Sequence, residues 1–264
     1  MVNRHLNGRT ALVTGSVAGL GNAIASRLAA DGANIVLSGL EPDEQGIAAA
    51  ENISSQHGVE VIYHRADLSD LGQIERMIDA VNVRFGTIDI LVNNAVVRNF
   101  AAIEDMQPEA WDTSIAVNLS AAFHAVRLIL PGMKTRRWGR IINMSSVYGW
   151  RGAAGRIDYV TTKTALIGLT RGIAVETASS GVTANALSPG SVPTPAIMSK
   201  LESMAEAQGA SLADVEKSYI SERHPTGRFV AMKNFAAMAS FLCSSAGDDI
   251  TGAVLPIDGG WTVS

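Results

Sequence analysis

Three polar residues with fixed spacings stand out in the chain. Tyr159 and Lys163 are four residues apart, and Ser146 lies thirteen residues before the tyrosine. On a helix, an i, i+4 pair shares one face, so the lysine ammonium would lie beside the phenol. A nearby cation stabilises phenolate and lowers its pKa from about 10, which lets tyrosine exchange a proton with an alcohol or ketone near neutral pH. Ser146 could hydrogen-bond the same substrate oxygen. By itself, a Tyr-x-x-x-Lys pair is more often an exposed helix face.

A glycine-rich turn, Thr14–Gly21, supplies a second pattern. It follows a short apolar run and precedes a helix-like stretch. The first N–H groups of a helix have no partners within it, and the helix dipole favours an anion there, so the turn suits a dinucleotide pyrophosphate. The spacing is GxxxGxG rather than the general GxGxxG, and a tight structural turn is the alternative. The candidate contacts are Gly15, Ser16, Gly19, Leu20 and Gly21.

Both strands and helices are needed to position these residues. The candidate strands are near-continuous apolar runs, as in a parallel sheet buried on both faces: Ala11–Val13, Asn34–Ser38, Val59–His64, Ile88–Asn93, Arg140–Ser145, Thr183–Leu187 and Val254–Ile257. The helix-like stretches between them are Leu20–Ala30, Leu71–Phe85, Trp111–Met133 and Tyr159–Ala178. This alternation predicts an α/β fold with a doubly wound, Rossmann-type parallel sheet in a single domain, residues 1–264.

One segment, Ser191–Pro225, interrupts the alternation and is called the lid segment below. It is helix-like around Ser199–Ser221 and has prolines near both ends. An insertion after the carboxyl end of a strand lies where ligands bind in such sheets, so we expect a helical lid over the substrate. An ordinary surface helical hairpin is the alternative.

The end of the second strand bears on the choice of cofactor. An acidic side chain there binds the ribose hydroxyls of NAD, whereas an arginine favours the 2′-phosphate of NADP. Neither stands at Gly39 or Leu40, and Glu41 is followed by Pro42, which leaves its direction open. Because no cation stands in the turn or at Leu40, a 2′-phosphate would be unpaired, and NAD is the expected cofactor.

Asp67 and Leu68 follow the third strand, at the edge where the adenine would lie. Asp67 could accept a hydrogen bond from the adenine amino group. The alternative is that it caps the next helix, although Ser69 or Asp70 would serve for that too.

The whole chain resembles the short-chain dehydrogenase/reductase family. The matching pieces are Thr14–Gly21, Asn93–Ala95, Asn118 in Val117–Leu119, Ser146, Tyr159 with Lys163, and Pro189–Gly190. The resemblance implies a seven-stranded parallel sheet, usually in a homotetramer. It also implies a catalytic tetrad of Asn118, Ser146, Tyr159 and Lys163, in which Asn118 would hold a water that passes protons from the lysine. Asn94, Pro189, Val192 and Thr194 would contact the cofactor. The family motif reads Asn-Asn-Ala-Gly, and here Val96 stands in place of the glycine.

Within the family, three stretches resemble bacterial D-3-hydroxybutyrate dehydrogenases: Gly32–Leu37, Ala101–Asp105 with Trp111, and Ile250–Thr262. Where those enzymes hold a small carboxylate with polar residues, this chain has Arg98, Tyr148, Arg156 and Lys200, and Ser191 replaces a tryptophan. Converging cations suit a carboxylate, sulfonate or phosphate, so the expected substrate is an anionic hydroxy- or keto-compound, larger than hydroxybutyrate if the serine widens the pocket. The alternative is that these cations form surface ion pairs.

Composition and net charge limit the classes of partner and ligand that the chain is expected to bind. A net charge of −4 argues against nucleic acid, and the single cysteine, Cys243, excludes a disulfide within the chain and a cysteine-based zinc site, so no metal is expected. The N-terminal residues show no signal-peptide pattern and no stretch is a good membrane span, which predicts a cytoplasmic protein. The leading hypothesis is an NAD-dependent dehydrogenase. The alternatives are an NADP-dependent reductase of a neutral or hydrophobic ketone and a non-enzymatic dinucleotide sensor.

Overall fold

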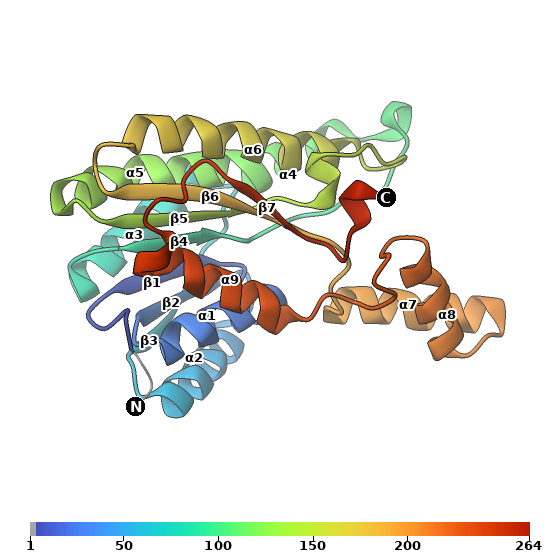
Figure 1. Ribbon diagram of the computed structural model, residues 1–264, viewed down its shortest axis with the longest axis horizontal. Helices are drawn as coiled ribbons and strands as arrows, with labels where there is room; N and C mark the ends of the chain where they lie inside the picture. The colour runs from blue at the N-terminus through green and yellow to red at the C-terminus, as the bar shows by residue number, and fades with distance from the viewer. Residues whose placement is uncertain (1–3) are drawn as a thin grey trace.

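Seven parallel strands form one sheet at the centre of the molecule (Figure 1). The computed structural model describes residues 4–264. Its strands are β1 Thr10–Thr14, β2 Asn34–Gly39, β3 Val61–Arg65, β4 Ile90–Asn93, β5 Gly139–Met144, β6 Val182–Pro189 and β7 Val254–Ile257. The order β3-β2-β1-β4-β5-β6-β7 reverses its direction between β1 and β4, which is where ligands bind in doubly wound sheets. The predicted fold class is confirmed.

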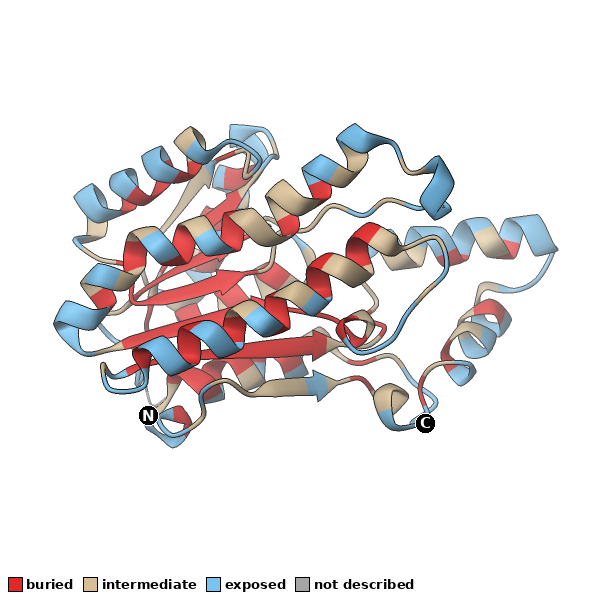
Figure 2. Cartoon of the chain, turned by 90° about the horizontal axis from the view of Figure 1, so that it is seen from above, coloured by how far each residue is buried: buried red, intermediate tan, exposed pale blue. Residues whose placement is uncertain are grey.

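Helices cover both faces of the sheet because alternate strand residues point to opposite sides. On β1, Ala11 and Val13 belong to one core and Leu12 to the other. The first core lies under α1 Gly19–Ala30, α2 Asp43–His57 and α9 Met232–Cys243. The second lies under α3 Leu71–Phe85, α5 Ala121–Arg136 and α6 Ile157–Thr177. The five inner strands are almost wholly buried in Figure 2, as the continuous apolar runs predicted, whereas the edge strands β3 and β7 are only partly buried.

The helical segment that precedes β5 is continuous but not uniform. It begins with α4 Pro108–Ile115, widens into a π-helical turn at Ala116–Ser120, and continues as α5. By length and composition alone this 29-residue segment could cross a membrane, but the core helix of a soluble protein passes the same test. The sequence predicted one helix over Trp111–Met133 and gave no sign of the π turn, which holds Asn118.

Two further predictions need correction. The third strand, predicted at Val59–His64, begins at Val61 and ends at Arg65. The lid segment contains two helices rather than one helical stretch, α7 Pro195–Gln208 and α8 Leu212–Ser221. They separate at Gly209, whose φ of +61° is strained for other residues, and Ser211 caps the second helix. The pair stands out from the sheet near the C-terminus in Figure 1 and has its own small apolar core.

Candidate active site

The glycine turn after β1 has the shape of an anion cradle. A Cβ on Gly15 would come within 2.8 Å of the Cα of Ala95, and one on Gly21 within 2.6 Å of the Asn94 amide nitrogen. At Gly19, by contrast, φ is +63° and the space beside the residue is open. Ala18 at the N-cap of α1 provides no side-chain cap, so the first N–H groups of the helix face that space. These features fit the pyrophosphate of a dinucleotide.

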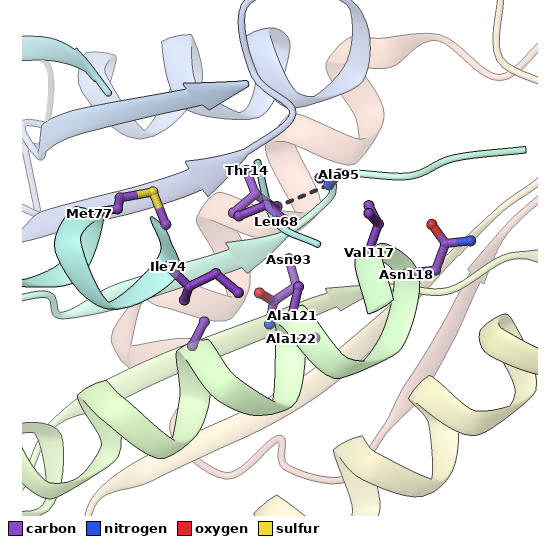
Figure 3. A pocket seen from close by; sticks show the side chains of 11 residues that line it. Thr14, Leu68, Ile74, Met77, Asn93, Ala95, Val117, Asn118, Ala121 and Ala122 are labelled. Carbon is purple, nitrogen blue, oxygen red and sulfur yellow. Dashed lines mark hydrogen bonds between the residues drawn. The ribbon is translucent and has the colours of Figure 1, made fainter. Parts of the chain in front are cut away.

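Asn94 shapes this turn from the end of β4. Its amide nitrogen donates to the carbonyls of Thr14 (3.0 Å) and Gly15 (2.7 Å). The Thr14 hydroxyl in turn accepts from the backbone N–H groups of Asn94 (3.0 Å) and Ala95 (3.1 Å), the latter drawn in Figure 3. The residue expected to contact the cofactor therefore acts as a brace that joins the two strands on either side of the crevice.

Glu41 resolves the direction that the sequence left open. Its carboxylate fills the space beside Gly39 at the end of β2, where a Cβ on Gly39 would stand. The turn is fixed by the Tyr63 hydroxyl, which donates to the carbonyl of Glu41 (2.7 Å) and lies 3.1 Å from that of Gly39. The Oε2 of Glu41 is a buried acceptor with no hydrogen-bond partner within residues 4–264. An unpaired acceptor here fits a ribose hydroxyl, and the neighbouring Leu40 is 59% exposed.

Asp67 and Leu68 lie on the same edge of the sheet. Asp70, not Asp67, is the N-cap of α3, and it accepts from the N–H of Gly72 at 2.8 Å. The Asp67 carboxylate instead accepts from the backbone and hydroxyl of Ser69. Leu68 lines a small cavity beneath the crevice, which has room for about one water molecule and whose other lining residues include Thr14 and Asn118 (Figure 3).

The Ser, Tyr and Lys side chains meet at the carboxyl end of β5. Tyr159 is 7% and Lys163 3% exposed, both on the first turns of α6. The lysine Nζ donates to the carbonyl of Met144 (2.7 Å) and lies 5.5 Å from the centre of the tyrosine ring. Ser146 accepts from the N–H of Tyr148 (3.2 Å) and interacts with the Tyr159 hydroxyl. The predicted catalytic group is therefore assembled around one phenol.

The electrostatics of this group favour the phenolate. Burial alone would raise the pKa of Tyr159, but the charges of Lys163 and Arg98, with hydrogen bonds from Ser146 and Arg98, bring it below its usual value. Burial lowers the pKa of Lys163, and Arg98 adds to that effect, while Tyr159 opposes it. The geometry thus provides an acid–base group that can work closer to neutral pH than a free tyrosine.

Asn118 is buried, and both polar atoms of its side chain already have hydrogen-bond partners. Its Oδ1 accepts from the N–H of Val97 (2.8 Å), and its Nδ2 donates to the Val97 carbonyl (3.0 Å). The side chain points away from Ile74 and Met77 in Figure 3. Asn118 therefore fixes the loop that follows β4, and the water relay implied for it stays a prediction.

Three cations surround the mouth of the site. The guanidinium of Arg156 lies 4.6 Å from the ring centre of Tyr159 and 4.2 Å from that of Phe100, and Arg98 lies 5.7 Å from the Tyr159 ring. Lys200, on α7, reaches to 5.9 Å from the Phe100 ring. None of the three forms an ion pair within the described chain. The alternative, that these three cations form surface ion pairs, is therefore not borne out.

Aromatic side chains also pack beside the catalytic tyrosine. Tyr148 packs edge-on against Tyr159, with ring centres 6.2 Å apart, and against Trp261 at 5.5 Å. Arg151 holds the C-terminal turn in place by donating to the carbonyl of Trp261 (2.6 Å). Neither Phe100 nor Trp261 was singled out from the sequence. Their only signals were their positions beside or within the stretches that resemble hydroxybutyrate dehydrogenases.

The segment after β6 closes the site where the nicotinamide would lie. Pro189 ends the strand, Val192 is buried in the core, and the Thr194 hydroxyl caps α7. The N–H of Ser191 donates to the buried ring of His224 (2.9 Å), which ties this segment to the far end of the lid segment.

Comparison with known proteins decides the family. A profile described as short chain dehydrogenase matches residues 9–205. The chain belongs to the short-chain dehydrogenase family. It is 45% identical over 256 residues to a D-beta-hydroxybutyrate dehydrogenase of Cupriavidus necator, covering 97% of this chain and 98% of that one. It is 39% identical over 254 residues to the enzyme of that name from Rhizobium meliloti, covering 96% and 98%.

Solved structures agree with this assignment. L-sorbose reductase from Gluconobacter frateurii, complexed with NADPH and L-sorbose, aligns with a TM-score of 0.95 at 28% identity and 99% coverage of both chains. Levodione reductase aligns with a TM-score of 0.89 at 30% identity, covering 98% of this chain and 99% of that one. The family member described here is an oxidoreductase that uses a nicotinamide dinucleotide, so the non-enzymatic alternative is set aside.

Proposed function

We propose that the chain is an NAD-dependent dehydrogenase of an anionic 3-hydroxy acid related to 3-hydroxybutyrate. The observation that carries this proposal is the placement of Arg98 and Arg156 against the ring of Tyr159 without carboxylate partners in the described chain. An unpaired guanidinium recognises a carboxylate through two parallel hydrogen bonds. The names of the two bacterial relatives point to the same class of substrate.

In the mechanism, Tyr159 takes the proton of the substrate hydroxyl while Ser146 hydrogen-bonds and orients the oxygen. Lys163 stays charged, and its positive charge stabilises the Tyr159 phenolate. Arg98 and Arg156 hold the substrate carboxylate, Lys200 closes over it from α7, and Tyr148 and Trp261 pack against the carbon chain. When bound, the nicotinamide accepts or supplies the hydride. The same groups run the reaction in reverse, with the neutral phenol as the proton donor.

NAD rather than NADP is proposed on the basis of Glu41. Its unpaired Oε2 would accept from a ribose hydroxyl, whereas a 2′-phosphate would bring negative charge to the same carboxylate. NADP has one observation in its favour. Arg65 stands opposite Gly39 in the β2–β3 register, so a cation is present at the neighbouring strand end. Measuring dissociation constants for both cofactors decides between them.

The substrate proposal is tested with matched compounds. D-3-hydroxybutyrate, larger 3-hydroxy acids and the methyl ester of each acid are offered with NAD and with NADP, and cofactor reduction is followed by absorbance. We expect a clear preference for the free acids with NAD. Equal kcat/KM values for acid and ester would contradict the anionic-substrate proposal and favour a neutral secondary alcohol. A preference for NADP would contradict the role of Glu41.

Three wider proposals accompany this function. The lid segment is proposed to cover the substrate, because Lys200 reaches the Phe100 ring from α7. A homotetramer is proposed because a largely apolar groove lies between α5 and α6, lined by residues that include Phe123, Leu130 and Leu169. Light scattering with gel filtration tests the assembly. A cytoplasmic location rests on the sequence alone and is tested by cell fractionation.

A further inference from the structure

The loop that follows β4, residues 97–101, brings two exposed side chains, Arg98 and Phe100, to the mouth of the site. The guanidinium carbon of Arg98 lies 5.7 Å from the ring centre of Tyr159. The ring centre of Phe100 lies 4.2 Å from the guanidinium carbon of Arg156. Because an exposed side chain is ordered only weakly by its own packing, the backbone that carries these two residues must be held by other contacts.

The residue between them, Asn99, makes its contacts inside the protein. Its amide nitrogen donates to Oδ2 of Asp158 (3.0 Å) and to the hydroxyl of Ser114 (2.9 Å). The Ser114 hydroxyl in turn donates to the same carboxylate oxygen at 2.6 Å. Asp158 and Ser114 are both fully buried. The three side chains therefore tie the loop to α4 and to the first turn of α6.

Backbone contacts hold the two ends of the same loop. At one end, the side chain of Asn118 exchanges two hydrogen bonds with the backbone of Val97. At the other end, the N–H of Ala101 donates to the carbonyl of Gly155 (3.2 Å) beside an isolated parallel bridge. Between these ends, the side chain of Asn99 connects the middle of the loop to α6.

We infer that Asp158 is a positioning residue of the active site: through Asn99, its buried carboxylate sets where Arg98 and Phe100 lie relative to the catalytic tyrosine. Asp158 directly precedes Tyr159 on α6. The helix that carries the proton-transfer group therefore also carries the anchor of the loop that faces it. A movement of α6 would displace both parts of the site together. Asp158 acts through the loop and exchanges no proton with the substrate.

The consequence for the substrate rests on the proposed function. If Arg98 binds the substrate carboxylate, a loosened loop has to be ordered again each time the acid binds, and this ordering weakens binding. KM for the acid should therefore rise while kcat changes little, because the lost interaction is made equally in the ground state and the transition state. The methyl ester should lose less, because only its contact with Phe100 depends on the loop.

The first measurement uses the enzyme without substrate. Hydrogen exchange at the Ala101 N–H is followed by mass spectrometry in the wild type, Asp158→Ala, Asp158→Asn and Asn99→Ala. We expect exchange to be about tenfold faster in the two alanine variants, because the loop opens more often. Asp158→Asn should exchange at nearly the wild-type rate, because its amide oxygen can replace Oδ2 as the acceptor. Unchanged exchange in peptides from β1 and β5 establishes that each variant is folded.

The second measurement is a double-mutant cycle on KM at saturating NAD, for a 3-hydroxy acid and its methyl ester. With the acid, Asp158→Ala and Asn99→Ala should each raise KM about tenfold at nearly constant kcat. The double variant should also show about a tenfold rise, because both changes remove one connection, whereas independent effects would multiply to about a hundredfold. Ser114→Ala is the matched control. It leaves the bond between Asn99 and Asp158 and should raise KM less.

The two measurements separate the inference from the proposed function. Unchanged exchange at Ala101 in both alanine variants would overturn the inference, as would KM effects that multiply in the double variant. The inference also fails if Asp158→Asn behaves like Asp158→Ala, or if kcat falls while KM stays constant. Faster exchange at Ala101 with equal rises in KM for acid and ester would uphold the positioning role of Asp158 and count against the anionic substrate.

Discussion

Replacing Arg156 by alanine should raise KM for an acidic substrate and leave a neutral analogue almost unaffected. The guanidinium lies 4.2 Å from the Phe100 ring and 4.6 Å from that of Tyr159, and it has no carboxylate partner in the described chain. A charge-assisted hydrogen bond contributes about 1.5–3 kcal/mol. Since about 1.4 kcal/mol is a factor of ten, KM for the acid should rise by one to two orders of magnitude. Arg156 is half-buried, so water screens part of this energy and the lower end is expected.

The assay compares D-3-hydroxybutyrate with its methyl ester at saturating NAD. The decisive quantity is the ratio of the two changes in kcat/KM. Arg156→Lys is the matched control, because it keeps the charge and loses the planar donor pair, and it should fall between the wild type and the alanine variant. Equal losses for acid and ester would mean that Arg156 supports Phe100 and the N-terminus of α6 rather than the substrate, and the reasoning from unpaired cations would be refuted.

Three further outcomes are expected. In Tyr159→Phe, NAD should bind with an unchanged dissociation constant while kcat falls by about 10²–10⁴, and near-normal turnover would refute the acid–base role. Leu40→Arg should shift cofactor preference toward NADP by giving the 2′-phosphate a partner, as measured by the ratio of the two dissociation constants; an unchanged ratio would show that the phosphate does not lie there. Because the pKa of Tyr159 is lowered, mainly by Lys163 and Arg98 against the effect of burial, oxidation should rise with pH through that pKa and reduction should fall. Oxidation that falls as pH rises through this range, or reduction that rises, would contradict the assignment.

Local pattern was enough to predict most of the fold. The helix at Leu71–Phe85 and the strand at Val254–Ile257 were predicted with their observed bounds, because each has a clear apolar period or run. The helices α2 and α9 were not identified. In α2 only Gly46, Ala50 and Ile53 are buried, so a mostly polar sequence hides a narrow apolar face. Tertiary packing selects such helices, and the sequence alone gives little sign of them.

In the candidate site, too, some residues could be predicted from local spacing and others meet only through tertiary packing. Tyr159, Lys163 and Ser146 follow from spacing on one helix and one strand end, so their meeting could be predicted. The approach of Phe100 and Trp261, far apart in the chain, depends on how the loop after β4 and the C-terminal turn pack. Glu41 could be counted as an acidic residue near β2, but only the bonds of Tyr63 to the turn fix its direction. Spacing along the chain carries no information about such contacts.

The two helices of the lid segment pack mainly on each other, through Leu201, Ala205 and Val215. A unit with its own core can move without unfolding, so opening it would break few contacts with the sheet. Release of the product through a lid that opens at such low cost would be fast, so breakage of the C–H bond, rather than departure of the product, would limit turnover. Substrate deuterated at the reacting carbon would then show a large isotope effect on kcat.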